Sequence, residues 1–529
     1  MEVLNYGSLG AGSFAPEYLV IPGGKSAVPT LTSRPPTVNL EIPSRPYITH
    51  LLNLSPLLVY GTSTEDAINV FDSSTPSPDA VRRLVWNSAS CSSSSISALV
   101  AAPPTAPSQA TLYTPSTNGK IAVWDLRNGS SGGAVVAELV GRGAPSVDGG
   151  RRPAAPADGP AYLCAAASED GYTLAAGTEL RGTDAVIDIW DLRSPAAPLF
   201  TYSESHSDDV STLSFCPSLP STSSSPSGVV PRSALLLSGS TDGLLSIFNT
   251  AVAQGDEDDA VVRVQNLGAS LARVGWGAGL GASFGAVGDG MEVEEEDDEK
   301  ARELAARTPK GLGGVWGVTD MQTLSVFDAD TFDNTTLSSF PVRSRTSLMP
   351  AFEPDYVIDL WPSSRLPTSS LSSSAGLSLW EGDSNGNFAL VGIPPPAVLV
   401  GDQATSEGGR KAEAWELGAF FPAGRRAHED IVRCVEYDQN TQTLFTGGED
   451  GRICFWNLGG GGGGEPAASE EQEGAQLPTA SFQATTPTAQ SAVGGGGNDF
   501  SGKARKDKVS GNLVGGAGRD GGRVRYRPF

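Results

Sequence analysis

The sequence is poor in the residues that carry catalytic chemistry. Only three histidines, His50, His206 and His428, occur among 529 residues. There is no HExxH pair, nucleophile elbow or phosphate-binding loop, and the glycine run at 459–464 lacks the lysine and serine or threonine of a phosphate loop. We therefore expect a protein that is not an enzyme, with no catalytic residue, no cofactor and no metal site.

Cysteines and long apolar runs are also scarce. The five cysteines show no Cys-x-x-Cys spacing, and four of them lie in strand-like segments, which favours buried free thiols in a reducing compartment. No stretch approaches the roughly 18 apolar residues that cross a bilayer. The N-terminal residues have neither the basic start nor the apolar run of a signal peptide. These features predict an intracellular protein, cytoplasmic and/or nuclear, without a membrane partner.

Positive charge is limited over most of the chain. The sequence has 36 Lys and Arg against 60 Asp and Glu, but residues 501–529 contain eight basic and two acidic side chains. An acidic body argues against binding a nucleic-acid backbone, which depends on Lys and Arg displacing counterions. The basic tail at 501–529 could contact RNA, direct nuclear import or simply remain solvated, and the sequence leaves these alternatives open.

A short phrase recurs along the chain. It reads GKIAVWDLRNG at 119–129, AVIDIWDLRSP at 185–195, LLSGSTDGLLSIFNT at 236–250 and LFTGGEDGRICFWNL at 444–458. Each copy has a turn residue about six positions before the aromatic that ends an alternating apolar strand. The repeat resembles the WD repeat of β-propellers, which implies an all-β fold.

The repeat count sets the number of blades. Seven positions end a third strand: Phe71, Trp124, Trp190, Phe248, Phe327, Val391 and Trp456. Their mean spacing is about 64 residues, compared with roughly 40–45 for a bare blade, so about 20 residues per blade must be insertion. We predict a seven-bladed WD-repeat propeller over 16–458, followed by a Gly-rich linker and a basic disordered tail at 459–529. The low-complexity insertions are expected near 141–160, 218–232, 280–311, 361–375 and 394–413.

The resemblance to WD repeats implies a buried polar chain in the seventh blade. In such repeats a turn Asp accepts from a His ring, the ring meets a hydroxyl, and the hydroxyl accepts from an indole N–H. The matching residues are His428, Thr446, Asp450 and Trp456. The fourth blade has His206, Ser238 and Asp242, but it ends on a phenylalanine that has no N–H, so its network should be weaker.

Blade topology also predicts where the insertions and the ring closure lie. In WD propellers the loops joining strands one to two and three to four are on the bottom face. All the insertions except 141–160 belong there, which leaves the top face less obstructed as a binding surface. An outer strand supplied by the opposite terminus should close the ring. The N-terminal segment 16–23 is our candidate, with 47–52 opening blade one and 480–486 as the competitor. If so, removing residues 1–30 should sharply lower the melting temperature.

The middle of the chain suggests a narrower resemblance. YSESHSDDVSTLSFCPS and the TDGLLSIFNT phrase resemble the WD repeat-containing protein 89 family. That resemblance implies a non-enzymatic scaffold for protein–protein interactions, with partners unnamed.

Two WDLR sequences provide a more specific hypothesis. Arg127 and Arg193, with Asp125 and Asp191, resemble the WDxR motif of propellers that recruit substrates to cullin-4 ubiquitin ligases through an adaptor. They are our candidate partner-binding residues, although each Arg could simply pair with a nearby carboxylate. A third alternative, a ribosome-assembly or RNA-particle factor, depends on the basic tail.

Overall fold

The computed structural model describes two stretches of strand near the N-terminus and most of the repeat region. The described residues are 19–20, 36–62, 67–86, 95–103, 111–127, 135–141, 159–217, 231–252, 257–277, 313–329, 340–342, 352–367, 376–393 and 415–458. The chain divides into two units, Met1–Gly460 and Gly461–Phe529. The second unit, with the expected linker and tail, lies outside the described residues.

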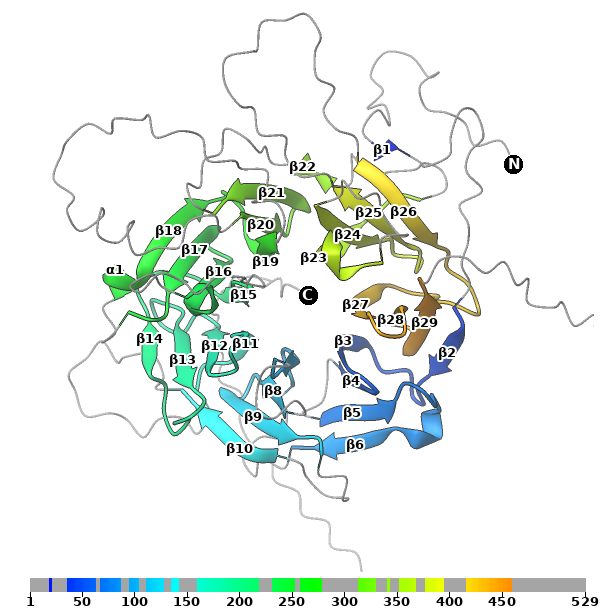
Figure 1. The fold of residues 1–529 in the computed structure, drawn as a ribbon, viewed down its shortest axis with the longest axis horizontal. Helices are drawn as coiled ribbons and strands as arrows, with labels where there is room; N and C mark the ends of the chain where they lie inside the picture. The colour runs from blue at the N-terminus through cyan, green and yellow to red at the C-terminus, as the bar shows by residue number, and fades with distance from the viewer. Residues whose placement is uncertain are drawn as a thin grey trace, which may run out of the picture. The chain divides into compact units, whose positions relative to one another are not determined.

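The described strands form seven sheets arranged in a ring (Figure 1). Blades one to three contain β3 (Ile48–Leu54), β4 (Leu57–Thr62), β5 (Ala67–Asp72) and β6 (Arg82–Val85); β7 (Val100–Ala101), β8 (Thr111–Pro115), β9 (Lys120–Asp125) and β10 (Val135–Val140); and β11 (Tyr162–Ala167), β12 (Thr173–Thr178), β13 (Ile187–Asp191) and β14 (Phe200–Tyr202). Blades four and five contain β15 (Val210–Phe215), β16 (Leu235–Ser240), β17 (Leu244–Asn249) and β18 (Val261–Asn266); and β19 (Leu271–Gly277), β20 (Gly314–Thr319), β21 (Thr323–Asp328) and β22 (Phe340–Pro341). Blade six contains β23 (Tyr356–Pro362), β24 (Leu377–Gly382), β25 (Phe388–Ile393), β26 (Trp415–Phe421) and, at its outer edge, β1 (Leu19–Val20). Blade seven contains β2 (Val38–Glu41), β27 (Val432–Asp438), β28 (Thr443–Gly448) and β29 (Arg452–Asn457). The predicted seven-bladed fold is confirmed.

Helical structure is confined to single turns within the described residues. They are η2 (Pro78–Ala80), η3 (Arg232–Ala234), η4 (Ser363–Arg365) and α1 (Glu257–Ala260). No helix in these residues has the length and hydropathy that crossing a membrane would require.

The seven residues predicted to end a third strand, from Phe71 to Trp456, which we call the anchors, occupy equivalent places in their blades. Each lies on the third strand of its blade opposite an apolar residue of the second strand, as Trp456 lies opposite Leu444. Val391 lies opposite Leu379 in the same register, so it replaces an aromatic without shifting the blade. The turn between these strands usually holds a glycine at positive φ, as at Gly451 (φ 71°); in blade five Gln322 takes this conformation (φ 57°).

The ring closes through the N-terminal part of the chain, but the predicted segment was wrong. β2 pairs antiparallel with β29, with Val38 opposite Phe455, whereas Leu19 and Val20 of the expected segment 16–23 pair with blade six. The physical reason is chain length: only residues 42–47 separate β2 from β3, which matches a tight passage from blade seven to blade one. The competing segment 480–486 lies outside the described residues.

The core lies between neighbouring blades. For example, Trp380, Phe388 and Phe421 of blade six pack with Leu444 and Trp456 of blade seven. Each blade therefore buries its apolar face against the next one, so the blades stabilise one another through these shared interfaces.

The strand order gives the intervals in which the insertions fall. Residues 218–230 lie between β15 and β16, 278–312 between β19 and β20, 368–375 between β23 and β24, and 394–414 between β25 and β26. Residues 142–158 follow β10 and precede β11. These intervals match the predicted first-to-second, third-to-fourth and blade-to-blade connections, although the inserted residues themselves lie outside the described ones.

Candidate functional site

The four residues expected in the polar chain of blade seven meet in one line of hydrogen bonds. His428 Nδ1 lies 3.2 Å from Asp450 Oδ1, and His428 Nε2 lies 2.7 Å from Thr446 Oγ1. The Trp456 indole N–H donates to Thr446 Oγ1 over 2.8 Å. A hydroxyl that accepts from the indole is free to donate to the ring, which fits a histidine protonated on Nδ1 and donating to Asp450. Every polar member of this buried chain is therefore satisfied.

Asp450 organises the turn around it. Its carboxylate also accepts from the backbone N–H groups of Glu429 and Arg452. Burial alone would raise the pKa of Asp450, but the hydrogen bonds from His428 and the backbone outweigh it and hold that pKa below its usual value. The charged carboxylate is thus part of the folded state.

Blade four repeats three of the four positions. His206 Nδ1 lies 3.2 Å from Asp242 Oδ2, and His206 Nε2 lies 2.7 Å from Ser238 Oγ. The order Ser–His–Asp resembles a catalytic triad, but Ser238 is fully buried within its sheet, so its hydroxyl is not open to a substrate.

Blades two and three differ in a hydrogen bond that the repeat pattern alone did not lead us to expect. The Trp124 indole donates to Thr114 Oγ1 over 2.8 Å, as Trp456 does to Thr446, and each threonine lies ten residues before its tryptophan. That spacing could have identified Thr114. In blade three the Trp190 indole N–H has no hydrogen-bond partner in the described residues, because Ala176 stands at the place of the threonine.

Blade three has a polar cluster of its own instead. The Asp188 carboxylate accepts from the Tyr162 hydroxyl and from the Thr201 hydroxyl, each over 2.5 Å. Asp188 is buried on β13, and a side chain at Gly141 would collide with it and with Tyr162. Nothing in the repeat pattern predicts this cluster, since its members lie on different strands.

The two WDLR sequences form the same turn in neighbouring blades. Arg127 Nε and Nη2 donate to the two carboxylate oxygens of Asp125 over 2.9 and 2.7 Å, and Arg193 does the same to Asp191 over 2.8 and 2.7 Å. Each Asp also accepts from the backbone N–H of its Arg, which fixes the turn. The Arg hydrogen bonds hold the pKa of both carboxyls below the usual value. Each arginine therefore pairs with the Asp of its own WDLR sequence, which is the local pairing that the sequence analysis kept as an alternative.

Both guanidinium groups nevertheless remain largely exposed. The side chains of Arg127 and Arg193 are 62% and 68% exposed. The Arg193 guanidinium lies 5.0 Å from the centre of the Tyr172 ring. Leu199 is also exposed, and it lies with Arg193 in the connection between β13 and β14. We refer to Arg127, Tyr172, Arg193 and Leu199 as the WDLR surface.

Ionisable side chains also lie on or beside the innermost strands: Arg365 on η4, Glu436 on β27 of blade seven and His50 on β3 of blade one. Arg365 Nη2 lies 2.6 Å from Glu436 Oε1, and its guanidinium lies over the Trp361 ring. Burial raises the pKa of Glu436 to about 7, against the opposing charge of Arg365. His50 on β3 donates from Nε2 to the Ser97 carbonyl, and burial lowers its pKa to about 4. His50 is therefore a neutral side chain with its own backbone partner, separate from the Arg365–Glu436 pair.

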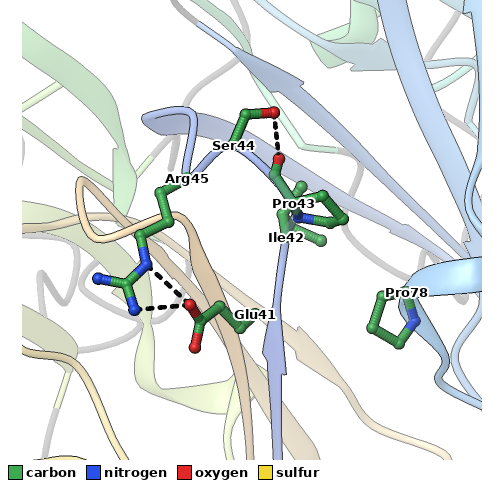
Figure 2. A pocket seen from close by; sticks show the side chains of 6 residues that line it. All are labelled: Glu41, Ile42, Pro43, Ser44, Arg45 and Pro78. Carbon is green, nitrogen blue, oxygen red and sulfur yellow. Dashed lines mark hydrogen bonds and ion pairs between the residues drawn. The ribbon is translucent and has the colours of Figure 1, made fainter.

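An open pocket lies where β2 turns into blade one. It is lined by Glu41, Ile42, Pro43, Ser44, Arg45 and Pro78 (Figure 2). Arg45 pairs with Glu41, and both side chains are at least half exposed. Ser44 and Arg45 both have positive φ, 69° and 46°, which places a sharp turn directly after the closing strand. Because the two charges satisfy each other, the pocket presents no converging set of free polar groups.

The expectations about metal sites and free thiols can be compared with the structure only over the described residues. In them no group of three or more His, Cys, Asp or Glu side chains is arranged to hold a metal ion. Cys164, Cys216, Cys434 and Cys454 are free thiols, and burial raises the pKa of Cys164 to about 12, so this thiol stays protonated.

Comparisons with known proteins agree with the repeat. Residues 422–457, which hold β27 to β29, match the model of the WD domain, G-beta repeat family. A stretch of 103 residues is 40% identical to an uncharacterized WD repeat-containing protein of Saccharomyces cerevisiae, covering 20% of this chain and 22% of that protein. A stretch of 113 residues is 30% identical to an uncharacterized WD repeat-containing protein of Schizosaccharomyces pombe, covering 21% and 30%.

A longer but weaker match is to WD repeat-containing protein GTS1 of Arabidopsis thaliana, 26% identical over 277 residues that cover 51% of this chain and 52% of that protein. All three matches span less than two thirds of the relatives' own lengths. Among solved structures, a chain of the structure titled Crystal Structure of Mitotic Checkpoint Complex aligns with a TM-score of 0.48 and 13% identity, over 83% of this chain and 96% of that one. The family-model match and the sequence relatives support the WD-repeat assignment, while the narrower resemblance to the WD repeat-containing protein 89 family stays a prediction.

Proposed function

We propose that this protein is a non-enzymatic scaffold that binds partner proteins through loops held by its propeller. The observation that supports this proposal best is the WDLR surface, in which two neighbouring blades present the same exposed guanidinium on the same kind of turn. Arginine and tyrosine are enriched in the centres of protein interfaces, and pre-ordered side chains lose less entropy on binding. A partner is expected to contact both turns at once.

The repeated geometry favours one specific version of this scaffold. Each Asp holds its Arg by two parallel N–H···O bonds, so the free edge of each guanidinium is aimed by the blade and not by a flexible side chain. This is the arrangement that a substrate receptor would offer to the adaptor of a cullin-4 ubiquitin ligase. In this version Asp125 and Asp191 position the arginines and Arg127 and Arg193 make the contact.

The test compares the double variant Arg127→Ala/Arg193→Ala with the native chain in affinity purification from cells. Arg82→Ala is the matched control, because Arg82 is an exposed arginine on the outer strand of blade one. We expect the double variant to lose partners that the control retains, with both variants folded. An unchanged set of partners in the double variant would contradict a binding role for the WDLR surface.

The ligase version needs its own measurement. Co-purification of the adaptor with the native chain, and its loss in the double variant, would support it. If the native chain does not bind the adaptor, or the double variant binds equally well, the ligase version is rejected while the scaffold proposal stands.

The alternative role in ribosome assembly or RNA particles depends on residues 501–529, which lie outside the described residues. It remains a prediction, and so does the intracellular location. Removing 501–529 should abolish nuclear or nucleolar accumulation or salt-sensitive RNA binding, and retention of both would count against it.

A further inference from the structure

The outer edge of blade six differs from the other described outer edges. Blade six alone among the described sheets has five strands, because β1 pairs in parallel with β26 (Figure 1). Leu19 lies opposite Trp415, and Val20 lies opposite Glu416. A segment from the N-terminal part of the chain thus covers an edge nearly 400 residues later in sequence.

The sequence of β26 suits a strand with neighbours on both sides. Outer strands usually carry charges that prevent further pairing, as Arg82 and Arg83 do on β6 and Arg263 does on β18. β26 reads WELGAFF and has one charged residue, as β18 does, so its charge does not set it apart. The difference is its three aromatic residues, compared with none on β6 or β18.

Burial shows the same contrast. Trp415, Leu417 and Phe420 of β26 are no more than 8% exposed and belong to one hydrophobic cluster. On β10, the outer strand of blade two, Val136 and Val140 are more than half exposed. The composition and burial of β26 are therefore those of an interior strand, whose outer N–H and C=O groups need a partner.

The segment that supplies β1 is short and bounded. It reads PEYLVIPG at 16–23, and its two prolines cannot donate to a strand ladder, so pairing is limited to the residues between them. Only two of these residues pair with β26. Seventeen residues separate Val20 from Val38 of β2, a tether that reaches about 23 Å if it behaves as a flexible chain. Such a tether gives an effective concentration in the millimolar range, so a weak contact suffices to keep the edge covered.

We propose that the outer edge of β26 is a docking site for an extended apolar strand, and that residues 16–23 of the same chain occupy it reversibly. The same sequence supplied from outside, as from a second copy of this chain, adds to the edge when the tethered segment is absent. Backbone hydrogen bonds provide the attraction, as in other cases of strand addition. This site is separate from the WDLR surface and does not depend on the proposed function.

The first test measures binding of a labelled peptide with the sequence of residues 16–23 by fluorescence anisotropy. A chain lacking residues 1–30 keeps β2 and therefore the ring closure. We expect this truncated chain to bind the peptide at least tenfold more tightly than the intact chain, whose own segment competes. A control peptide carrying Leu19→Pro and Val20→Pro, which lacks both N–H groups, should not bind.

Three results would overturn the proposal: no binding to the truncated chain, equal affinity for the intact and truncated chains, or equal binding of the control peptide. This assay does not involve Arg127 or Arg193. Its result therefore does not depend on whether the scaffold proposal is correct.

The second test locates the site by hydrogen exchange. Amides of residues 415–421 should exchange faster in the truncated chain than in the intact one and regain protection when the peptide is added, while those of 135–140 on β10 stay unchanged. If the truncated chain does not fold, the full-length variant Leu19→Pro/Val20→Pro replaces it in both tests. Unchanged exchange at 415–421 in that variant would refute the docking site.

Discussion

Blades seven and three carry the same tryptophan in the same register but hold it in different ways. In blade seven Trp456 donates to Thr446, which continues through His428 to the Asp450 carboxylate. In blade three Trp190 packs edge-on against Tyr162 at 5.9 Å and finds no acceptor in the described residues. Both blades therefore pack the tryptophan in the same position, and only blade seven also links it to a chain of polar side chains.

The two blades also differ in how their strands are assembled along the chain. Blade seven is assembled from two distant parts of the chain, β2 and β27 to β29, whereas the strands of blade three follow one another directly. A fully satisfied buried network favours one arrangement of the strands over others, because any slip leaves polar groups unpaired. The blade that closes the ring has the complete network.

Removing the closing strand should have the largest effect. A chain lacking residues 1–45 loses Leu40 and Ile42 from the cluster that they form with Ile48 and Phe455, and burial of two such side chains is worth about 3–6 kcal/mol before the lost hydrogen bonds are counted. We expect it to melt well below the chain lacking 1–30, which retains β2, in differential scanning calorimetry. Similar melting of the two truncated chains would mean that β2 does not close the ring. The sharp fall in melting temperature that was expected on removal of residues 1–30 is therefore expected on removal of 1–45, because the closing strand is β2.

Breaking the network itself should have the next largest effect. Asp450→Ala leaves the His428 ring and two backbone N–H groups without their acceptor, at a cost of about 2–3 kcal/mol. Asp242→Ala in blade four removes the matching bonds from His206 and two backbone N–H groups. Because Asp450 also pairs with Arg452 at 3.9 Å, Asp242→Ala should cost less, about 1–2 kcal/mol. Urea unfolding of both variants at pH 7 measures the difference, and equal losses would contradict the ranking.

The Asp450 effect should also depend on pH. Its pKa is lowered in the folded protein, so the stability that it contributes is present above the unfolded pKa of about 4 and is lost as pH falls through the folded pKa. The difference between the native chain and Asp450→Ala is therefore expected to be constant from pH 5 to 7 and to shrink near pH 3. A difference that grows on acidification would show that the carboxylate is not charged in the folded state.

A pair of conservative substitutions isolates one hydrogen bond. Trp456→Phe and Trp190→Phe remove the same atoms from equivalent positions, but only the first breaks a bond, to Thr446. We expect Trp456→Phe to be more destabilising by about 1 kcal/mol. Trp124→Phe should resemble Trp456→Phe because Trp124 donates to Thr114. Equal costs at all three positions would mean that packing alone holds these rings.

The smallest effect is expected on the surface of blades two and three. Arg127→Ala and Arg193→Ala each remove an exposed ion pair with a neighbour two residues away, a kind of pair that adds little to stability in water. Their melting temperatures should equal that of the native chain within error. A clear drop for either variant would show that the turn, and not a partner contact, explains the WDLR sequence.

The repeat spacing was informative where each interaction lies within one blade. The intervals from His428 to Asp450 and from Thr446 to Trp456 are set by the length of two paired strands and their turn, so they can be read along the sequence. Thr114 has the same ten-residue interval and could have been predicted too. The Tyr162–Asp188–Thr201 cluster also lies within one blade, but no other repeat shares it, so its spacing could not be recognised along the sequence.

Alternation and spacing over short distances were enough to predict the seven anchors, the succession of strands within the blades and the polar chains of blades four and seven. Only the tertiary structure decided which N-terminal strand closes the ring and which one covers blade six. LV at 19–20 is apolar and VNLE at 38–41 alternates apolar and polar residues, but both strands are too short for their sequence to specify which sheet edge they join. The choice depends on the distance that the chain must span to reach β3, and on which sheet edge is open when the ring has closed.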